Sequence, residues 1–131
     1  MILLDTSALY ALGSSTDVNH AAALATLDAL EASGEELLLH TYVLAETFAL
    51  VLRRVGLSKA LEVDAQTAGI ETVSVDRMLH DKALAWLRGR RTSRFSLVDA
   101  VSFVVMAEHG VEQAFAFDPD FERAGFRLFH A

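Results

Sequence analysis

Four acidic residues occupy comparable places along the chain, where their carboxylates could act together on a bound cation or substrate. Each ends an expected strand or lies within the helix of a strand–helix unit, and together they are Asp5, Glu46, Asp99 and Asp118. Ligands of open α/β sheets gather outside the carboxyl ends of the strands. This placement therefore predicts that the four side chains converge in space.

Each of these residues also has an ordinary structural explanation. Asp5 could cap a helix, and Ser96-Leu-Val-Asp99 has the spacing of a capping box. Glu46 could pair with Arg53, although its face of the expected helix is largely apolar, which predicts a carboxylate that is not on a plainly solvated surface. Asp118-Pro-Asp120 alone is an ordinary turn or helix start. The functional interpretation therefore depends on the four acids together.

Four neighbouring carboxylates cannot all stay ionised without help. Two of them about 4 Å apart repel by roughly 4 kcal/mol at an effective dielectric constant near 20. A divalent cation is the simplest neutraliser, and oxygen-only sites suit Mg²⁺ first and Mn²⁺ next. The chain has no cysteine, and its five histidines form no recognisable ligand pair. Such a site usually acts on phosphate.

The elements expected to carry these acids alternate along the chain. Short apolar runs predict buried parallel strands at 1–4, 36–40, 70–75, 113–117 and 126–129. Each of the seven glycines follows a stretch of helical character, as a C-terminal cap does, which predicts about seven helices. The pattern indicates an α/β/α sandwich with a mostly parallel central sheet of four or five strands.

Length and composition limit the class of protein. The chain has 131 residues, of which 53% are hydrophobic and 22% charged, with one proline, so we expect one domain over residues 1–131. The apolar runs are too short to span a membrane, and the first residues lack the basic region of a secretory signal. We expect a cytoplasmic protein.

The charge is unevenly distributed. The formal net charge is −7, and residues 1–50 contain no lysine or arginine. Four arginines lie in a short glycine-containing stretch that is expected to be an exposed loop: Arg88, Arg90, Arg91 and Arg94. They form either a local basic patch that contacts a polyanion or merely a solvated helix end and loop.

Four segments, in order and spacing, resemble the PIN-domain ribonucleases and, among them, the VapC-type toxins of prokaryotic toxin–antitoxin pairs. The resemblance covers the full length and rests on Ile-Leu-Leu-Asp-Thr-Ser-Ala-Leu at 2–9, Thr-Tyr-Val-Leu-Ala-Glu at 41–46, Phe-Ser-Leu-Val-Asp-Ala-Val-Ser-Phe at 95–103, and Ala-Phe-Ala-Phe-Asp-Pro-Asp-Phe at 114–121 followed by Gly125 and Phe126.

This resemblance implies a Mg²⁺- or Mn²⁺-dependent endoribonuclease. Asp5 and Asp99 would be the core metal ligands, Glu46 and Asp118 would complete the acidic quartet, and a metal-activated water would attack the RNA phosphodiester. Two sets of residues would assist: the arginines above would contact phosphates, and supporting roles would fall to Thr6, Ser7 and Asp120.

The resemblance also implies partners, and the chain departs from the family in two places. Family members are commonly homodimers held inactive by a small antitoxin that covers the acidic cleft. Ala116 stands where the family often has Thr or Ser, which removes a hydroxyl, and Asp120 stands where it often has His. Asp120 would either help the site or cap the final helix.

Three alternatives remain at this point. A metal- or RNA-binding regulator of the same fold that no longer cuts RNA would share every feature above. A receiver-like signalling domain needs a lysine at a strand end, yet Lys59 and Lys82 lie in expected helices. A haloacid-dehalogenase-type phosphatase needs a second aspartate just after Asp5, and the chain has Thr6-Ser7 there.

Overall fold

The fold is a three-layer α/β/α sandwich built on one parallel sheet. The computed structural model describes residues 1–90 and 94–130. The five strands are β1 (Ile2–Leu4), β2 (Leu37–His40), β3 (Glu71–Val73), β4 (Gln113–Phe115) and β5 (Arg127–Leu128). All paired strands run parallel in the order β3-β2-β1-β4-β5. The expected architecture is confirmed.

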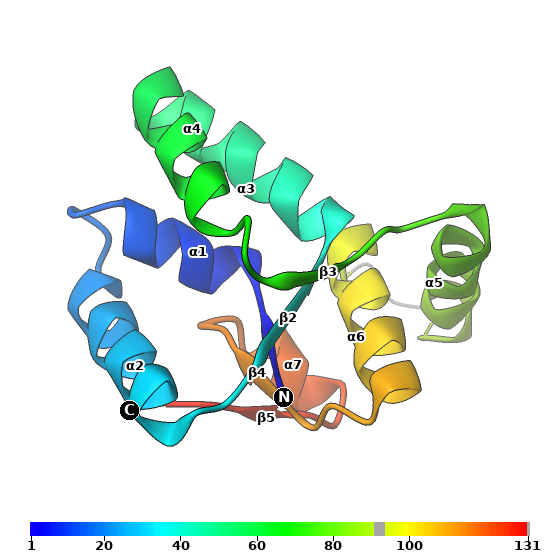
Figure 1. Cartoon of the computed structure of the whole chain (residues 1–131). Helices are drawn as coiled ribbons and strands as arrows, with labels where there is room; N and C mark the ends of the chain where they lie inside the picture. Colours follow the sequence, from blue (N-terminus) through cyan, green and yellow to red (C-terminus); the bar gives the residue numbers. More distant parts are fainter. Residues whose placement is uncertain (91–93, 131) are drawn as a thin grey trace.

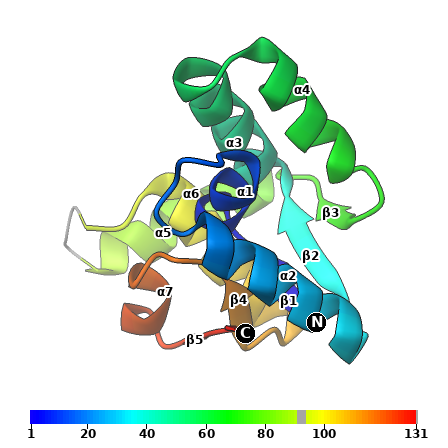
Figure 2. The same cartoon turned by 90° about the vertical axis from the view of Figure 1, so that its left-hand side faces the viewer.

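Seven helices of the described residues cover the sheet. They are α1 (Thr6–Gly13), α2 (His20–Ser33), α3 (Thr41–Arg54), α4 (Leu57–Gln66), α5 (Arg77–Arg90), α6 (Leu97–His109) and α7 (Asp120–Arg123). Figure 1 shows α1 to α4 on one side of the sheet and α5 and α6 on the other, and Figure 2 shows α2 and α6 on opposite sides of β1 and β4. None of these helices is both long and apolar enough to cross a membrane.

Two apolar clusters hold the layers together. One packs the face of the sheet that carries Leu3 against α6 residues such as Phe103. The other packs Ile2 and Leu4 against the helices on the opposite face, with Leu9 of α1 among them. Because successive side chains of a strand point to opposite faces, the continuous apolar run of β1 supplies both clusters.

Some of the glycines end helices as expected, and others do not. Gly34 and Gly110 are left-handed C-caps, with φ of 70° and 66°, as expected. Gly89 instead lies inside α5, so the stretch that begins at Arg88 is helical as far as Arg90 and is not wholly a loop. Arg88 and Arg90 lie in the last turn of this helix, where their charges oppose the negative end of its dipole.

Gly13 is required by close packing between α1 and α4. A Cβ built on Gly13 would lie 2.7 Å from Val63 Cγ2, whereas one on Gly89 meets nothing within 4 Å. We expect Gly13→Ala to destabilise the protein by about 1–2 kcal/mol through overpacking, and Gly89→Ala to stabilise it by about 0.5–1 kcal/mol. Urea unfolding midpoints measure both, and equal shifts of the same sign would contradict the packing argument.

Candidate active site

The four acids predicted from the sequence surround the point where the strand order reverses. β1 lies between β2 and β4, so connections leave it in both directions, and such a reversal leaves a crevice outside the carboxyl ends of the strands. Asp5 directly follows β1, and Asp118 lies three residues beyond the end of β4. Their placement agrees with the position that the sequence predicts.

Asp5 is the most buried of these carboxylates, with 4% of its surface exposed. Its Oδ2 accepts hydrogen bonds from Ser7 N at 3.1 Å and Ser7 Oγ at 2.6 Å, so Asp5 caps α1 as well. Ser7 Oγ in turn accepts from Phe117 N at 2.9 Å. Ser7 thereby joins the loop that carries Asp5 to the residue just before Asp118.

Asp99 opens α6 in a complete capping box. Ser96 Oγ accepts from Asp99 N at 3.0 Å, and Asp99 Oδ2 accepts from Ser96 N at 3.3 Å. The capping explanation is therefore correct, but it uses only one oxygen of the carboxylate. Burial, aided by the charges of Asp5 and Asp118, raises the pKa of Asp99 to about 7.

Asp118 and Asp120 lie against Asp99. One carboxylate oxygen from each of the three residues lies within 4.8 Å of the others. Asp118 Oδ1 accepts from Asp120 N at 2.9 Å, and Asp120 Oδ1 forms an ion pair with Arg123 at 2.8 Å. Asp120 therefore contributes to the acidic cluster while it also begins α7.

Glu46 differs from the sequence expectation. It is exposed on α3, as are Ala49 and Arg53, because the buried residues of that helix are Val43, Thr47 and Val51. The expectation of a carboxylate away from a plainly solvated surface is therefore wrong. The charge of Glu46 nevertheless acts on Asp5. Burial, followed by the charges of Asp118 and Glu46, raises the pKa of Asp5 to about 6 despite the opposing Ser7 hydrogen bonds.

The donor chemistry of the cluster fits a hard divalent cation. Asp5, Asp99 and Asp118 each use one oxygen in the hydrogen bonds found among the described residues, which leaves the second oxygen for a ligand. The raised pKa values of Asp5 and Asp99 show that the charged forms are poorly compensated by the protein alone. Thr6 Oγ1, beside Asp5, is also buried without a hydrogen-bond partner among the described residues.

His40 ties two of the acid-bearing helices together. His40 is the last residue of β2, and its side chain is buried. Its Nδ1 accepts a hydrogen bond from Val43 N at 3.3 Å and so caps α3. Since Nδ1 accepts, the network assigns the proton to Nε2, which donates to Ser102 Oγ of α6 at 2.8 Å. Burial lowers the pKa of His40 to about 4, so the ring is neutral at pH 7.

We expect His40→Ala to destabilise the protein by about 2 kcal/mol, because it removes a helix cap and leaves buried polar groups unpaired. His40→Asn keeps an acceptor for the cap and should lose about half as much. Thermal unfolding of both variants and of Ser102→Ala checks this, and an unchanged midpoint for His40→Ala would contradict the role.

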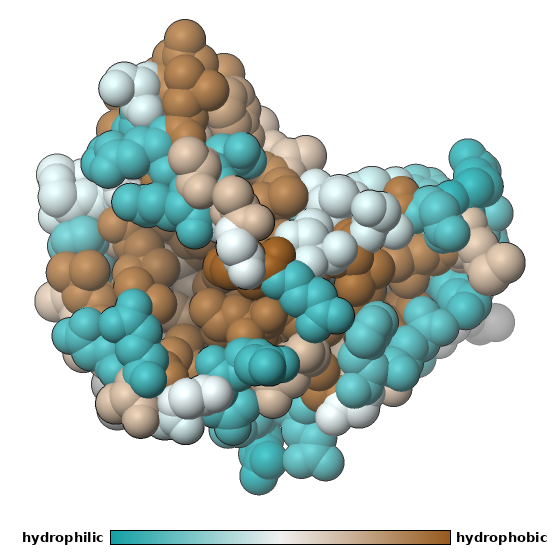
Figure 3. All heavy atoms as spheres, viewed as in Figure 1, coloured by the Kyte–Doolittle hydropathy of each residue, from teal (hydrophilic) through white to brown (hydrophobic). Residues whose placement is uncertain are grey.

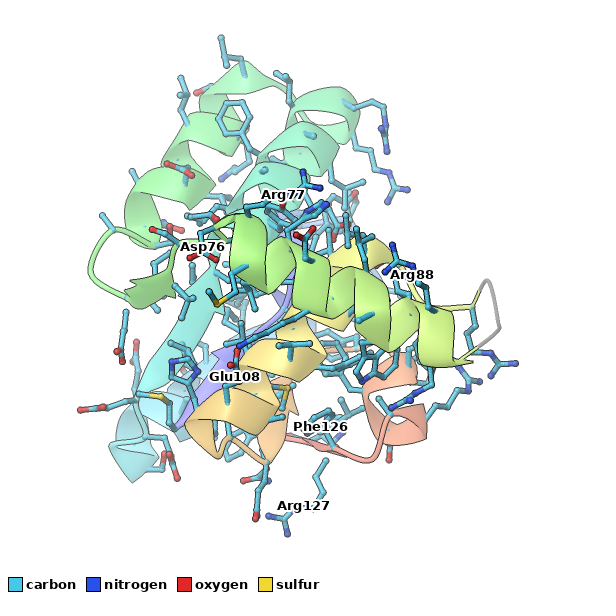
Figure 4. The ribbon with its side chains drawn as sticks, turned by 90° about the vertical axis from the view of Figure 1, so that its right-hand side faces the viewer. Asp76, Arg77, Arg88, Glu108, Phe126 and Arg127 are labelled. Carbon is cyan, nitrogen blue, oxygen red and sulfur yellow. The ribbon has the colours of Figure 1, made fainter. Side chains whose placement is uncertain are left out.

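A cluster of aromatic side chains connects the basic residues at the end of α5 to α7, which begins at Asp120. Figure 4 shows Arg88 on α5, and the guanidinium of Arg90 stacks over Trp86 at 4.0 Å from the ring centroid. Trp86 packs on Phe103, which contacts Phe121 of α7, one residue after Asp120. Arg94 is exposed, and the predicted contact at Arg91 lies outside the described residues.

Comparison with known proteins decides the family. The model of the PIN domain matches residues 2–127. The chain belongs to the PIN-domain family. This PIN domain is 37% identical over 131 residues to the 23S rRNA-specific endonuclease VapC20 of Mycobacterium tuberculosis, in strains CDC 1551 / Oshkosh and H37Rv, covering 96% of this chain and 95% of the relative.

A solved structure gives the same result. The crystal structure of Mycobacterium tuberculosis VapC20, described as a sarcin–ricin loop cleaving toxin, superposes with a TM-score of 0.89 and 34% identity, over 100% of both chains. The resemblance of this PIN domain to VapC-type toxins is confirmed. The sheet order also differs from the order 2-1-3-4-5 of receiver-type folds, which argues against the signalling alternative.

Two features of the site were not predicted from the sequence. Ser7 joins the loops of Asp5 and Asp118 only through its hydrogen bond with Phe117, which is 110 residues away in the sequence. The hydrogen bond between His40 and Ser102 spans 62 residues. The one available signal was Ser102, a polar residue on an otherwise apolar stretch of α6, because a buried hydroxyl requires a partner.

Proposed function

We propose that this PIN domain is a divalent-metal-dependent endoribonuclease of the VapC type. The observation that carries the proposal is the convergence of Asp5, Glu46, Asp99 and Asp118. Burial, followed by the charges of neighbouring acids in this set, raises the pKa values of Asp5 and Asp99. We assign Asp5 and Asp99 as core ligands of Mg²⁺ or Mn²⁺, with Glu46 and Asp118 completing the site and Asp120 in support.

The chain's own groups would position the substrate and the ligands. A divalent cation bound here would supply a nucleophile at neutral pH and stabilise the charge that develops on the attacking and leaving oxygens. Ser7 would fix the distance between the loops of Asp5 and Asp118. The capping box would hold Asp99 in one rotamer, and Arg123 would do the same for Asp120. Thr6 would supply a nearby hydroxyl.

The substrate we propose is ribosomal RNA. The relative with 37% identity is named for 23S rRNA, and the structural neighbour for the sarcin–ricin loop. In this chain, phosphate contacts would come from Arg88, Arg90, Arg91 and Arg94. Arginines suit an unpaired RNA strand, because a guanidinium can contact phosphate or stack on a base, and Trp86 orients the guanidinium of Arg90.

We further propose a small antitoxin as inhibitor, a homodimer as the assembled form, and the cytoplasm, where ribosomes are, as the place of action. Figure 3 shows an apolar hollow between α2 and α4. It has a volume of about 480 Å³ and is lined mainly by leucines, among them Leu24, Leu27 and Leu30 of α2. A surface of this kind supports a protein partner.

A synthetic sarcin–ricin hairpin RNA tests the proposed activity. The purified chain, free of partners, should cut it at one position in Mn²⁺ or Mg²⁺ and leave it intact in EDTA. Binding of this RNA without cleavage in any metal would instead favour the regulator that no longer cuts. Cleavage that persists in EDTA would contradict the metal-dependent mechanism.

A further inference from the structure

Four arginines of the described residues form no ion pair, and they lie in two groups. Arg53 and Arg54 end α3, while Arg88 and Arg90 end α5. One member of each group lies over an aromatic ring. Arg90 lies over Trp86 at 4.0 Å, and Arg54 lies over Tyr10 of α1 at 5.3 Å from the ring centroid. Arg53 and Arg54 were not among the RNA contacts predicted from the sequence.

Arg54 lines a cavity between helices that lie on the opposite side of the sheet from α5 (Figure 1). This cavity, here the α1–α3 pocket, has a volume of about 490 Å³. Its polar lining is Arg54, Lys59, His20 and the hydroxyls of Ser14, Ser15 and Thr16. No acidic residue lines it, whereas the cavity between β2 and β3 is lined by Glu35, Glu36 and Glu71. The α1–α3 pocket is therefore suited to an anion.

Two of the helices that line this pocket, α1 and α3, also connect it to acids of the site. α1 starts one residue after Asp5 and ends at Gly13 in the pocket, and α3 carries Glu46 before it ends at Arg54. Eight helical residues span about 12 Å. This distance corresponds to a few nucleotides of an RNA strand.

Two ordinary explanations account for only part of the arrangement. Basic residues in the last turn of a helix oppose the negative end of its dipole, which explains Arg53 and Arg54 in part. Lys59 pairs with Glu62 at 2.9 Å, but both side chains are exposed, and such a pair contributes little to stability. Neither explanation accounts for Arg54 lying over Tyr10 beside a pocket that lacks acids.

We propose that the α1–α3 pocket binds a backbone phosphate of the RNA substrate a few nucleotides from the scissile bond. This inference rests on the proposed function. Arg54, oriented by Tyr10, and Lys59 contact the phosphate oxygens, and the hydroxyls of the 14–16 loop complete the pocket. The RNA thus spans the acidic site between two basic patches on a chain whose net charge is −7.

The experiment measures RNA binding apart from cleavage. Asp5→Asn serves as the background, and the anisotropy of a labelled sarcin–ricin hairpin gives Kd between 50 and 200 mM salt. Adding Arg54→Ala should weaken binding about three- to tenfold and reduce the slope of log K against log salt by about 0.7, one phosphate contact. Arg127→Ala is the matched control, because Arg127 pairs with Glu112 at the opposite edge of the sheet.

A neutral linkage in the RNA locates the contact. Methylphosphonates placed singly along the hairpin should weaken binding at one position a few nucleotides from the cut, and that loss should disappear in Arg54→Ala. If Arg54→Ala binds as Arg127→Ala does while the wild type cuts RNA, the pocket proposal is wrong and the nuclease proposal stands. If Arg54→Ala weakens binding but the wild type never cuts, the pocket stands and the nuclease proposal is wrong.

Discussion

Asp5→Asn and Asp99→Asn should each lower the rate of RNA cleavage by at least about 100-fold. Loss of a group that only orients a metal ligand typically costs 10- to 100-fold, and a core ligand should cost no less. Asparagine keeps the helix-capping acceptor at both positions, so the fold should survive. Single-turnover cleavage of the sarcin–ricin hairpin at saturating Mn²⁺ measures the effect.

Asp28→Asn is the matched control for this prediction. Asp28 is exposed on α2, and the substitution makes the same chemical change away from the site. It should leave the cleavage rate unchanged. Circular dichroism of all three variants confirms that they are folded. Full activity in both site variants would remove these carboxylates from the mechanism.

The same substitutions should stabilise the metal-free protein at pH 8. Ionised Asp5 and Asp99 are desolvated and lie near other carboxylates, so their folded-state pKa values exceed 3.8, the ordinary value. By linkage, removing one charge should raise the free energy of unfolding by roughly 1–3 kcal/mol, after allowance for the partial exposure of Asp99. Saturating Mg²⁺ should stabilise the wild type and have little effect on either variant.

The sign of the pH dependence follows from the same shifts. Between pH 8 and 6.5 the folded protein takes up more protons than the unfolded chain, mainly on Asp99, so stability rises as the pH falls. We expect a net gain of about 0.5 kcal/mol, or roughly 2 °C in Tm, because proton uptake by His40 in the unfolded chain offsets part of the carboxylate contribution. His40 opposes this trend over the whole interval and more strongly below pH 6.5, because the unfolded chain protonates it near its ordinary pKa of 6.5 whereas the folded protein does so only near pH 4.

Differential scanning calorimetry in EDTA checks this prediction at pH 8.0 and 6.5. The rise in Tm should vanish in Asp99→Asn and in the wild type with Mg²⁺. A wild-type Tm that falls over this interval would show that the carboxylate cluster does not control stability.

The sheet and the acids were predictable because local patterns determine them. Residues such as Leu3 and Leu38 are fully buried, which agrees with strands that are apolar on both faces. The placement of Asp5 and Asp118 follows from the rule for strand ends, and the capping box at Asp99 follows from spacing alone. Each of these features depends on a few consecutive residues.

Other features depend on which element packs on which, and the sequence does not encode that locally. The solvent exposure of Glu46 depends on which face of α3 packs on α1, and the buried face proved to be that of Val43 and Val51. The glycine at position 89 indicated a loop, yet α5 continues through it because α5 packs along α6. The partners of Ser7 and His40 likewise require the folded chain.

The most direct test of the central claim is to map cut sites in total bacterial RNA. The purified chain would be incubated in Mn²⁺, in EDTA, and as Asp5→Asn in Mn²⁺, and the new 5′ ends would be sequenced. The account predicts discrete cuts in 23S rRNA that appear only with the wild type in Mn²⁺. Absence of any cut, or the same cuts in EDTA or with Asp5→Asn, would contradict it.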